Sequence, residues 1–156
     1  CVMRVLVGLS DVEANIIVTV GKQINPEMFG PQPDKILITQ YIPQTELLPH
    51  CDLVISHGGS GTVIATLAHG LPMVLMPMGA DQINNASRCQ SLGFGEVLNV
   101  MTMTSSDIAE TVNRVLADTS YRKVAEGLKA EMDKLPPPTY AVFLLERLSR
   151  DAQSIA

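Results

Sequence analysis

Apolar residues along the chain gather in two kinds of run, short β-branched runs and longer runs in which they recur every three or four positions. The short runs predict buried strands at 15–20, 35–40, 53–56, 73–76 and 96–99. The longer runs predict helices at 2–12, 43–50, 61–69, 81–92, 104–117, 119–135 and 138–152. Strands that alternate with helices indicate βαβ units, so the pattern predicts an α/β fold with a parallel sheet covered on both faces.

Several helix ends carry their own sequence signals. Thr104 followed by Asp107 resembles a capping box in which Asp stands for Glu. Gly70 and Gly93 follow two predicted helices and are expected in the left-handed conformation that closes a helix. The helix at 138–152 has an apolar stripe made of Ala141, Leu144, Leu145 and Leu148.

The stretch Leu-Val-Ile-Ser-His-Gly-Gly-Ser-Gly-Thr at 53–62 reads as a strand, a glycine-rich turn and the start of a helix. Glycines let a ligand approach the backbone amides closely. The unpaired N–H groups of a helix N-terminus favour anions, most often phosphate. His57, Ser60 and Thr62 can add side-chain donors. The stretch therefore predicts a phosphate site, with a tight strand-to-helix turn as the plainer alternative.

Two other glycine-loop chemistries do not fit this stretch. No Lys follows the glycines, as a P-loop requires, and Ile64 stands where the dinucleotide fingerprint has its third Gly. A nucleophile elbow needs Gly on both sides of the Ser. Ser56 and Ser60 each lack one of these glycines, so a hydrolase is not favoured.

Polar and aromatic residues also follow the neighbouring strands. Tyr41 follows the strand at 35–40, and Asp81 and Gln82 come after the loop that follows 73–76. The carboxyl ends of parallel strands meet at one edge of a sheet, where ligands bind. Asp81 is either a helix N-cap or an acceptor for sugar hydroxyls, and Tyr41 either packs at an edge or stacks on a base.

Composition narrows the partners. The chain has 156 residues, the size of one domain, with 46% hydrophobic residues and a net charge of −5. Without a basic run it has no electrostatic footprint for nucleic acid or for an anionic membrane. Its most apolar run, 71–80, is too short to span a bilayer, so we expect neither nucleic-acid binding nor stable membrane insertion.

The three cysteines, Cys1, Cys51 and Cys89, lie far apart and lack metal-ligand spacing. We expect them to be small buried thiols in a reducing compartment, which favours a cytoplasmic protein. The sequence contains neither D-x-D nor H-x-x-x-H, so no metal site and no cofactor are predicted.

Taken in order, the motifs Y-I-P-Q, L-L-P-H-C-D-L-V-I-S-H-G-G-S-G-T, A-H-G-L-P-M-V-L-M-P, D-Q and L-G-F-G resemble the C-terminal, donor-binding half of a UGT-type GT-B glycosyltransferase. The bacterial natural-product enzymes are the most similar group. The resemblance covers nearly the whole chain and implies a Rossmann-like three-layer domain over 1–156. It also implies a metal-independent, inverting transfer of a hexose from a nucleotide sugar to a hydroxyl of a small-molecule acceptor.

The resemblance implies a role for each motif residue. Tyr41, where the family usually has Trp, would stack on the pyrimidine, with the Ile42 backbone at the base edge and Gln44 near the ribose. Ala65 stands where users of UDP-glucose commonly have Glu, which favours a dTDP-sugar over a UDP-sugar. The diphosphate would be held by His57, Gly58, Gly59, Ser60, Gly61 and Thr62. The hexose would contact Met78, Asp81 and Gln82.

The resemblance also implies partners. In the family the N-terminal domain carries the acceptor site and the catalytic base, so no catalytic residue is expected in this chain. The first strand of the donor domain also has no counterpart here. Because that strand is central in a Rossmann-like sheet, we expect exposed strand edges, with a partner chain, such as a second copy in a homodimer, supplying the strand, or a rearranged sheet. The alternative is a non-catalytic nucleotide-binding or scaffold module that acts with a separate catalytic subunit.

Overall fold

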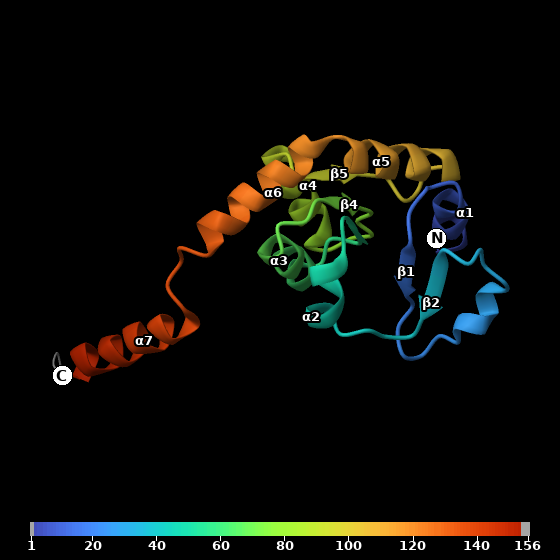
Figure 1. The fold of residues 1–156 in the computed structure, drawn as a ribbon. Coiled ribbons are helices and arrows are strands. Elements are labelled where there is room, and N and C mark those ends of the chain that lie inside the picture. Colours follow the sequence, from blue (N-terminus) through green and yellow to red (C-terminus); the bar gives the residue numbers. More distant parts are fainter. Residues whose placement is uncertain (1, 154–156) are drawn as a thin grey trace.

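The computed structural model describes residues 2–153 (Figure 1). Its strands are β1 (Ile16–Thr19), β2 (Ile36–Thr39), β3 (Val54–Ser56), β4 (Met73–Leu75) and β5 (Gly95–Val97). Its helices are α1 (Val2–Ser10), α2 (Gln44–Leu47), α3 (Ser60–Ala68), α4 (Gln82–Leu92), α5 (Ser105–Ala117), α6 (Thr119–Met132) and α7 (Pro138–Gln153), with 3-10 turns η1 (Pro26–Phe29) and η2 (Leu48–His50). Every predicted strand and helix is present, with ends that differ by a few residues. Cys1 lies outside the described residues.

All strand pairs are parallel, as predicted, but the strands form two separate sheets. β1 pairs with β2, with Ile16 opposite Ile36. The second sheet has the order β3-β4-β5, with Val54 opposite Met73 and Met73 opposite Gly95. The α/β class is therefore confirmed, and the one predicted sheet is corrected to two.

β1 and β3 each have one edge without a strand partner among residues 2–153. The amides of Ile16 and Val54 donate to the carbonyls just before β2 and β4, at 2.8 and 3.1 Å. Peptide groups alternate in direction along a strand, so those of Ile17 and Ile55 face the free edges. Such edges are what a Rossmann-like sheet without its first strand would leave.

The larger sheet has helices on both faces, which gives three layers (Figure 1). β4 is its centre, and Met73, Val74 and Leu75 are all fully buried. On one face, Val74 joins a cluster with residues of α1 and α5, such as Leu9 and Ile108. On the other, residues of β4 join a cluster with α4, α6 and β5, against which α3 also packs.

α1 lies very close to α5 because residue 8 has no side chain. A Cβ on Gly8 would lie 2.5 Å from the Ser105 carbonyl oxygen and 2.9 Å from Ile108 Cβ. The cluster under these helices also contacts Ile16 of β1 and Ile55 of β3. Both sheets are therefore fixed to the same apolar layer.

The helix signals in the sequence are confirmed. Thr104 and Asp107 form a capping box in which each side chain accepts from the other's backbone amide. Gly70 and Gly93 have positive φ values of 67° and 85° after α3 and α4, the left-handed conformation expected there.

α7 extends away from the rest of the molecule (Figure 1). Its predicted stripe is apolar and helical, but Leu145 is 66% exposed, and Leu144 and Leu148 are exposed as well. Periodicity identifies such a face without specifying what covers it. Among the described residues, no helix is both long and apolar enough to cross a membrane.

Candidate functional site

The glycine-rich turn links β3 to α3, and its backbone explains its glycines. Gly58 has φ +86°, a conformation that residues with a side chain rarely adopt. A Cβ there would also lie 3.2 Å from Leu75 Cδ2 and 3.4 Å from the Gln82 carbonyl oxygen. A Cβ on Gly59 would lie 2.8 Å from His57 Nε2, so the imidazole lies directly over this glycine.

The N-terminus of α3 is open to a ligand. Gly59 is its N-cap residue, and no side chain among residues 2–153 makes a capping hydrogen bond to the helix. The first intrahelical bond runs from the Val63 amide to the Gly59 carbonyl at 3.0 Å. The amides of Ser60, Gly61 and Thr62 thus precede the first intrahelical donor. Together with His57 and the two hydroxyls, they can hold an anion.

The start of α4 lies against this turn. Asn85 Nδ2 donates to the Gly58 carbonyl at 2.9 Å and to Asp81 Oδ2 at 3.1 Å. The Met78 amide donates to Gln82 Oε1 at 2.9 Å, which closes the loop after β4. The structure thus brings the predicted sugar-binding residues next to the glycine turn.

Asp81 does not act as an N-cap. It occupies the N-cap position of α4, but its side chain makes no capping hydrogen bond and its backbone is helical, at φ −67° and ψ −17°. A capping residue needs an extended backbone to direct its side chain at the free amides. The exposed carboxylate therefore remains available to a ligand at the carboxyl end of β4.

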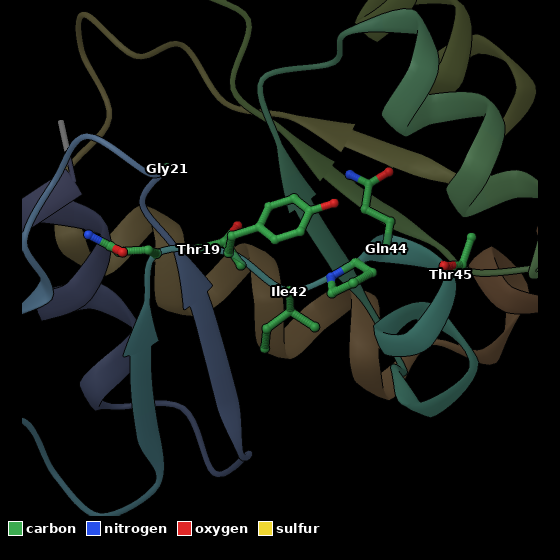
Figure 2. Close-up of a pocket in the computed structure, with 8 residues that line it drawn as sticks. Thr19, Gly21, Ile42, Gln44 and Thr45 are labelled. Carbon is green, nitrogen blue, oxygen red and sulfur yellow. The ribbon is translucent and has the colours of Figure 1, made fainter.

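A pocket of about 420 Å³ lies where β1 and β2 end and α2 begins. Figure 2 shows Thr19 and Gly21 on one side of it and Gln44 and Thr45 on the other, with Ile42 between. Tyr41 also lines it and is 58% exposed. Its remaining lining residues are Gln40 and Pro43. The predicted base and ribose residues Tyr41, Ile42 and Gln44 therefore share one pocket.

Two contacts describe the surroundings of Tyr41 and Gln44. Lys22 Nζ lies 5.0 Å from the centroid of the Tyr41 ring, a cation–π distance. Gln44 Nε2 donates to Thr62 Oγ1 at 3.3 Å. This hydrogen bond joins the pocket to the first turn of α3.

Ala65 does not line the pocket. It lies on α3, four residues after Gly61 and so on the same face. Its carbonyl oxygen lies 2.8 Å from His69 Nδ1. That contact is the one expected of a histidine near a helix end.

The described thiols do not have the chemistry of a nucleophile. Cys51 and Cys89 are free. Burial raises the pKa of both, and the Asp52 carboxylate further raises that of Cys51. A raised pKa keeps a thiol protonated and unreactive. Residues 2–153 also contain no group of three His, Cys, Asp or Glu side chains that could hold a metal ion.

The sequence analysis gave no role to Asn85 or to five residues of the pocket lining. These five are Thr19, Gly21, Gln40, Pro43 and Thr45. Asn85 had a detectable signal, because it is four residues after Asp81 and so on the same face of a helix. The signal for Thr19 and Gly21 was weaker: both lie at the carboxyl end of a predicted strand, where ligands of parallel sheets bind.

In structure the chain is similar to solved glycosyltransferases. It matches glycosyltransferase VinC, crystallised in complex with dTDP, with a TM-score of 0.89 and 26% identity over 97% of this chain and 38% of that one. It matches spinosyn rhamnosyltransferase SpnG, complexed with thymidine diphosphate, with a TM-score of 0.84 and 25% identity over 93% and 40%. The architecture is that of the C-terminal domain of a GT-B glycosyltransferase.

In sequence, residues 3–148 match the family described as "Erythromycin biosynthesis protein CIII-like, C-terminal domain", so the chain belongs to this family. It is 34% identical over 146 residues to 3-alpha-mycarosylerythronolide B desosaminyl transferase of Saccharopolyspora erythraea, covering 94% of this chain and 34% of that protein. It is 31% identical over 134 residues to demethyllactenocin mycarosyltransferase of Streptomyces fradiae, covering 86% and 29%. The chain spans about a third of the length of these curated relatives.

Proposed function

We propose that the chain is the donor-binding domain of an inverting glycosyltransferase, which moves a hexose from a dTDP- or UDP-sugar to a hydroxyl of a small-molecule acceptor. One observation carries the proposal. At the carboxyl ends of the strands, one hydrogen bond links the pocket to the first turn of α3, and two more link the Asp81 carboxylate through Asn85 to the turn before that helix. A nucleotide sugar has the same three parts in the same order: base, diphosphate and sugar.

In this proposal the base and ribose occupy the pocket, with the base stacked on Tyr41 and held by the Ile42 backbone. The diphosphate lies on the amides of residues 60–62 beside His57. The hexose contacts Met78, Asp81 and Gln82. The Asp81 carboxylate can accept hydrogen bonds from vicinal hydroxyls, and the Gln82 amide can both donate to them and accept from them.

The domain's chemical task is to stabilise the leaving group. An acceptor hydroxyl attacks the anomeric carbon, and negative charge develops on the departing diphosphate. Preorganised amides and a histidine placed at that charge lower the barrier. Because the amides, His57 and the hydroxyls supply these donors, the proposal needs no metal ion.

The remaining chemistry belongs to other parts of the protein. A base that deprotonates the acceptor hydroxyl would come from an N-terminal acceptor domain of the same protein. The free edges of β1 and β3 would take a strand from that protein or from a second copy in a homodimer. We place the reaction in the cytoplasm, in keeping with the free thiols Cys51 and Cys89.

We favour dTDP over UDP because of Ala65, which lies outside the pocket lining but on the face of α3 that carries Gly61. A methyl group there offers no acceptor for a ribose 2′-hydroxyl, and a deoxyribose needs none. VinC and SpnG, which have this fold, were crystallised with dTDP.

Calorimetric titration of the chain with dTDP and with UDP tests the proposal. Saturable binding is expected, tighter for dTDP, and His57→Ala should weaken it about tenfold, as removal of a hydrogen bond to a charged group does. His50→Ala, an exposed histidine at the end of η2, is the matched control and should bind as the unchanged chain does. If neither nucleotide binds, the scaffold alternative is favoured. If binding is unaffected by His57→Ala, the diphosphate assignment is wrong.

A further inference from the structure

Asn85 lies at the junction of two parts of the proposed site. It sits in the second turn of α4 and is half-buried. Its side-chain NH₂ group has two hydrogens. Both are used, one by the Gly58 carbonyl at 2.9 Å and one by Asp81 Oδ2 at 3.1 Å. One partner, Gly58, is 27 residues away in the sequence, and the other, Asp81, is one helical turn away.

At its first partner, Asn85 fixes the direction of a peptide group. Gly58 is buried and has no side chain that could hold the turn against α4. The peptide between Gly58 and Gly59 is trans, so the Gly59 N–H points opposite to the Gly58 carbonyl. A bond that holds the carbonyl towards α4 therefore also fixes the Gly59 amide. That amide directly precedes the helix N-terminus assigned to the diphosphate.

At its second partner, Asn85 fixes a carboxylate. Asp81 is exposed and makes no capping hydrogen bond. The bond from Asn85 to Oδ2 is the one hydrogen bond that residues 2–153 provide to this side chain. An exposed Asp without such a partner would sample several rotamers. With it, Oδ1 is left free in a defined position to accept from a hexose hydroxyl.

We propose that Asn85 is a positioning residue that couples the diphosphate turn to the hexose-binding carboxylate. The proposal rests on the function proposed above. The diphosphate turn and the Asp81 carboxylate are then already in position when a nucleotide sugar binds. Binding therefore does not include the entropic cost of ordering the Asp81 side chain. A merely structural Asn85 would support the fold without linking these two recognitions.

The test compares two ligands across a double-mutant cycle. dTDP and dTDP-glucose are titrated by calorimetry into the unchanged chain, Asn85→Ala, Asp81→Ala and the double variant. Asn84→Ala is the matched control, because Asn84 is the exposed neighbour on α4 and its side chain makes no hydrogen bond within the described residues. Thermal unfolding of each variant reports on the fold separately.

For Asn85→Ala, affinity for dTDP should fall about fivefold, as expected from one lost hydrogen bond, and affinity for dTDP-glucose should fall about fivefold further. In the Asp81→Ala background, Asn85→Ala should lower the affinity for dTDP-glucose no more than the affinity for dTDP, because the carboxylate that Asn85 positions is already absent. Asn84→Ala should change neither affinity. Asn85→Asp keeps the size of the side chain but places a second carboxylate beside Asp81 and the diphosphate turn. It should lower the affinity for both ligands more than Asn85→Ala does.

The outcomes separate the two levels of the argument. If the unchanged chain binds neither ligand, the proposed function fails and this inference with it. If it binds both but Asn85→Ala and Asn85→Asp leave the ratio of the two affinities unchanged, the positioning role is overturned and the proposed function stands. If Asn85→Ala does not fold, the ratio measured with Asn85→Asp decides.

Discussion

The two sheets of this domain differ in how they are supported. In β3-β4-β5 the central strand is fully buried between two helical layers. In β1-β2 the side chain of Ile17 is 44% exposed and that of Leu37 is 56% exposed, and the apolar layer under α1 and α5 supports the other face through Ile16. The residues proposed to hold the diphosphate and the hexose follow strands of β3-β4-β5, and the pocket proposed for the base lies at the end of β1-β2.

Under the proposed function, this difference gives the two halves different roles. Residues that stabilise a departing charge must be held rigidly, because donors that have to reorganise lose their advantage. The turn after β3 has that support from Leu75 and α4. A base needs a flat partner and a few edge contacts, which a less supported half can supply. Local opening should therefore be easier in β1-β2.

The largest expected effect tests the unequal support directly. Leu75→Ala removes a fully buried side chain from β4 and should lower the free energy of unfolding by about 2–5 kcal/mol. Leu37→Ala, at an exposed position of β2, should cost less than about 1 kcal/mol. Urea titration of both variants measures the comparison. Similar losses for the two would show that both sheets contribute equally to the core.

An intermediate effect concerns the turn that the larger sheet supports. Gly58→Ala places a Cβ at φ +86° and 3.2 Å from Leu75 Cδ2, which should cost about 1–3 kcal/mol of stability. Gly61→Ala is the matched control for stability, because a Cβ there meets nothing within 4 Å. Thermal unfolding compares the two. A neutral Gly58→Ala would mean that the turn relaxes without the support described here.

The smallest effect is a pH dependence confined to the helices that cover the larger sheet. Hydrogen bonds from the backbone amides of Thr104 and Ser120 lower the pKa of Asp107 and Asp118 below 3.8, the ordinary value. A lowered pKa stabilises the fold above the ordinary pKa, and this contribution is lost as the pH falls through the lowered value.

The free energy of unfolding, measured by urea as the pH is lowered from about 6 into the acid range below the ordinary carboxyl pKa, should therefore decline at the acid end. Asp107→Ala should flatten that decline, whereas Asp34→Ala, an exposed carboxyl in a loop without a hydrogen bond in the described chain, should not. If both variants flatten the acid decline equally, the helix caps are not its cause.

Local patterns predicted most of this structure. The strands, the helices, the capping box and the closing glycines depend on neighbours in sequence, and all are present. The glycine turn was predicted from a local pattern too. The position of the candidate site at the carboxyl ends of the strands was predicted from the rule that ligands of parallel sheets bind there.

What the sequence did not show depends on contacts between distant segments. Asn85 and Gly58 are 27 residues apart, and nothing in either local pattern indicates that they meet. Thr19 and Gly21 enter the pocket because β1 lies beside β2. The apolar stripe of α7 was predicted correctly as a pattern, but its exposure could not be, because periodicity does not name a neighbour.

Under the proposed function, the hydrogen bond from Gln44 to Thr62 has a consequence for product release. In the proposed complex a nucleotide diphosphate contacts both sheets, and this 3.3 Å bond joins the same two halves beside it. In that complex the nucleoside diphosphate would leave once both its contacts with α3 and its contacts with the pocket are broken. The dissociation rate would then follow the opening of the β1-β2 half, and turnover would be set by the less supported sheet.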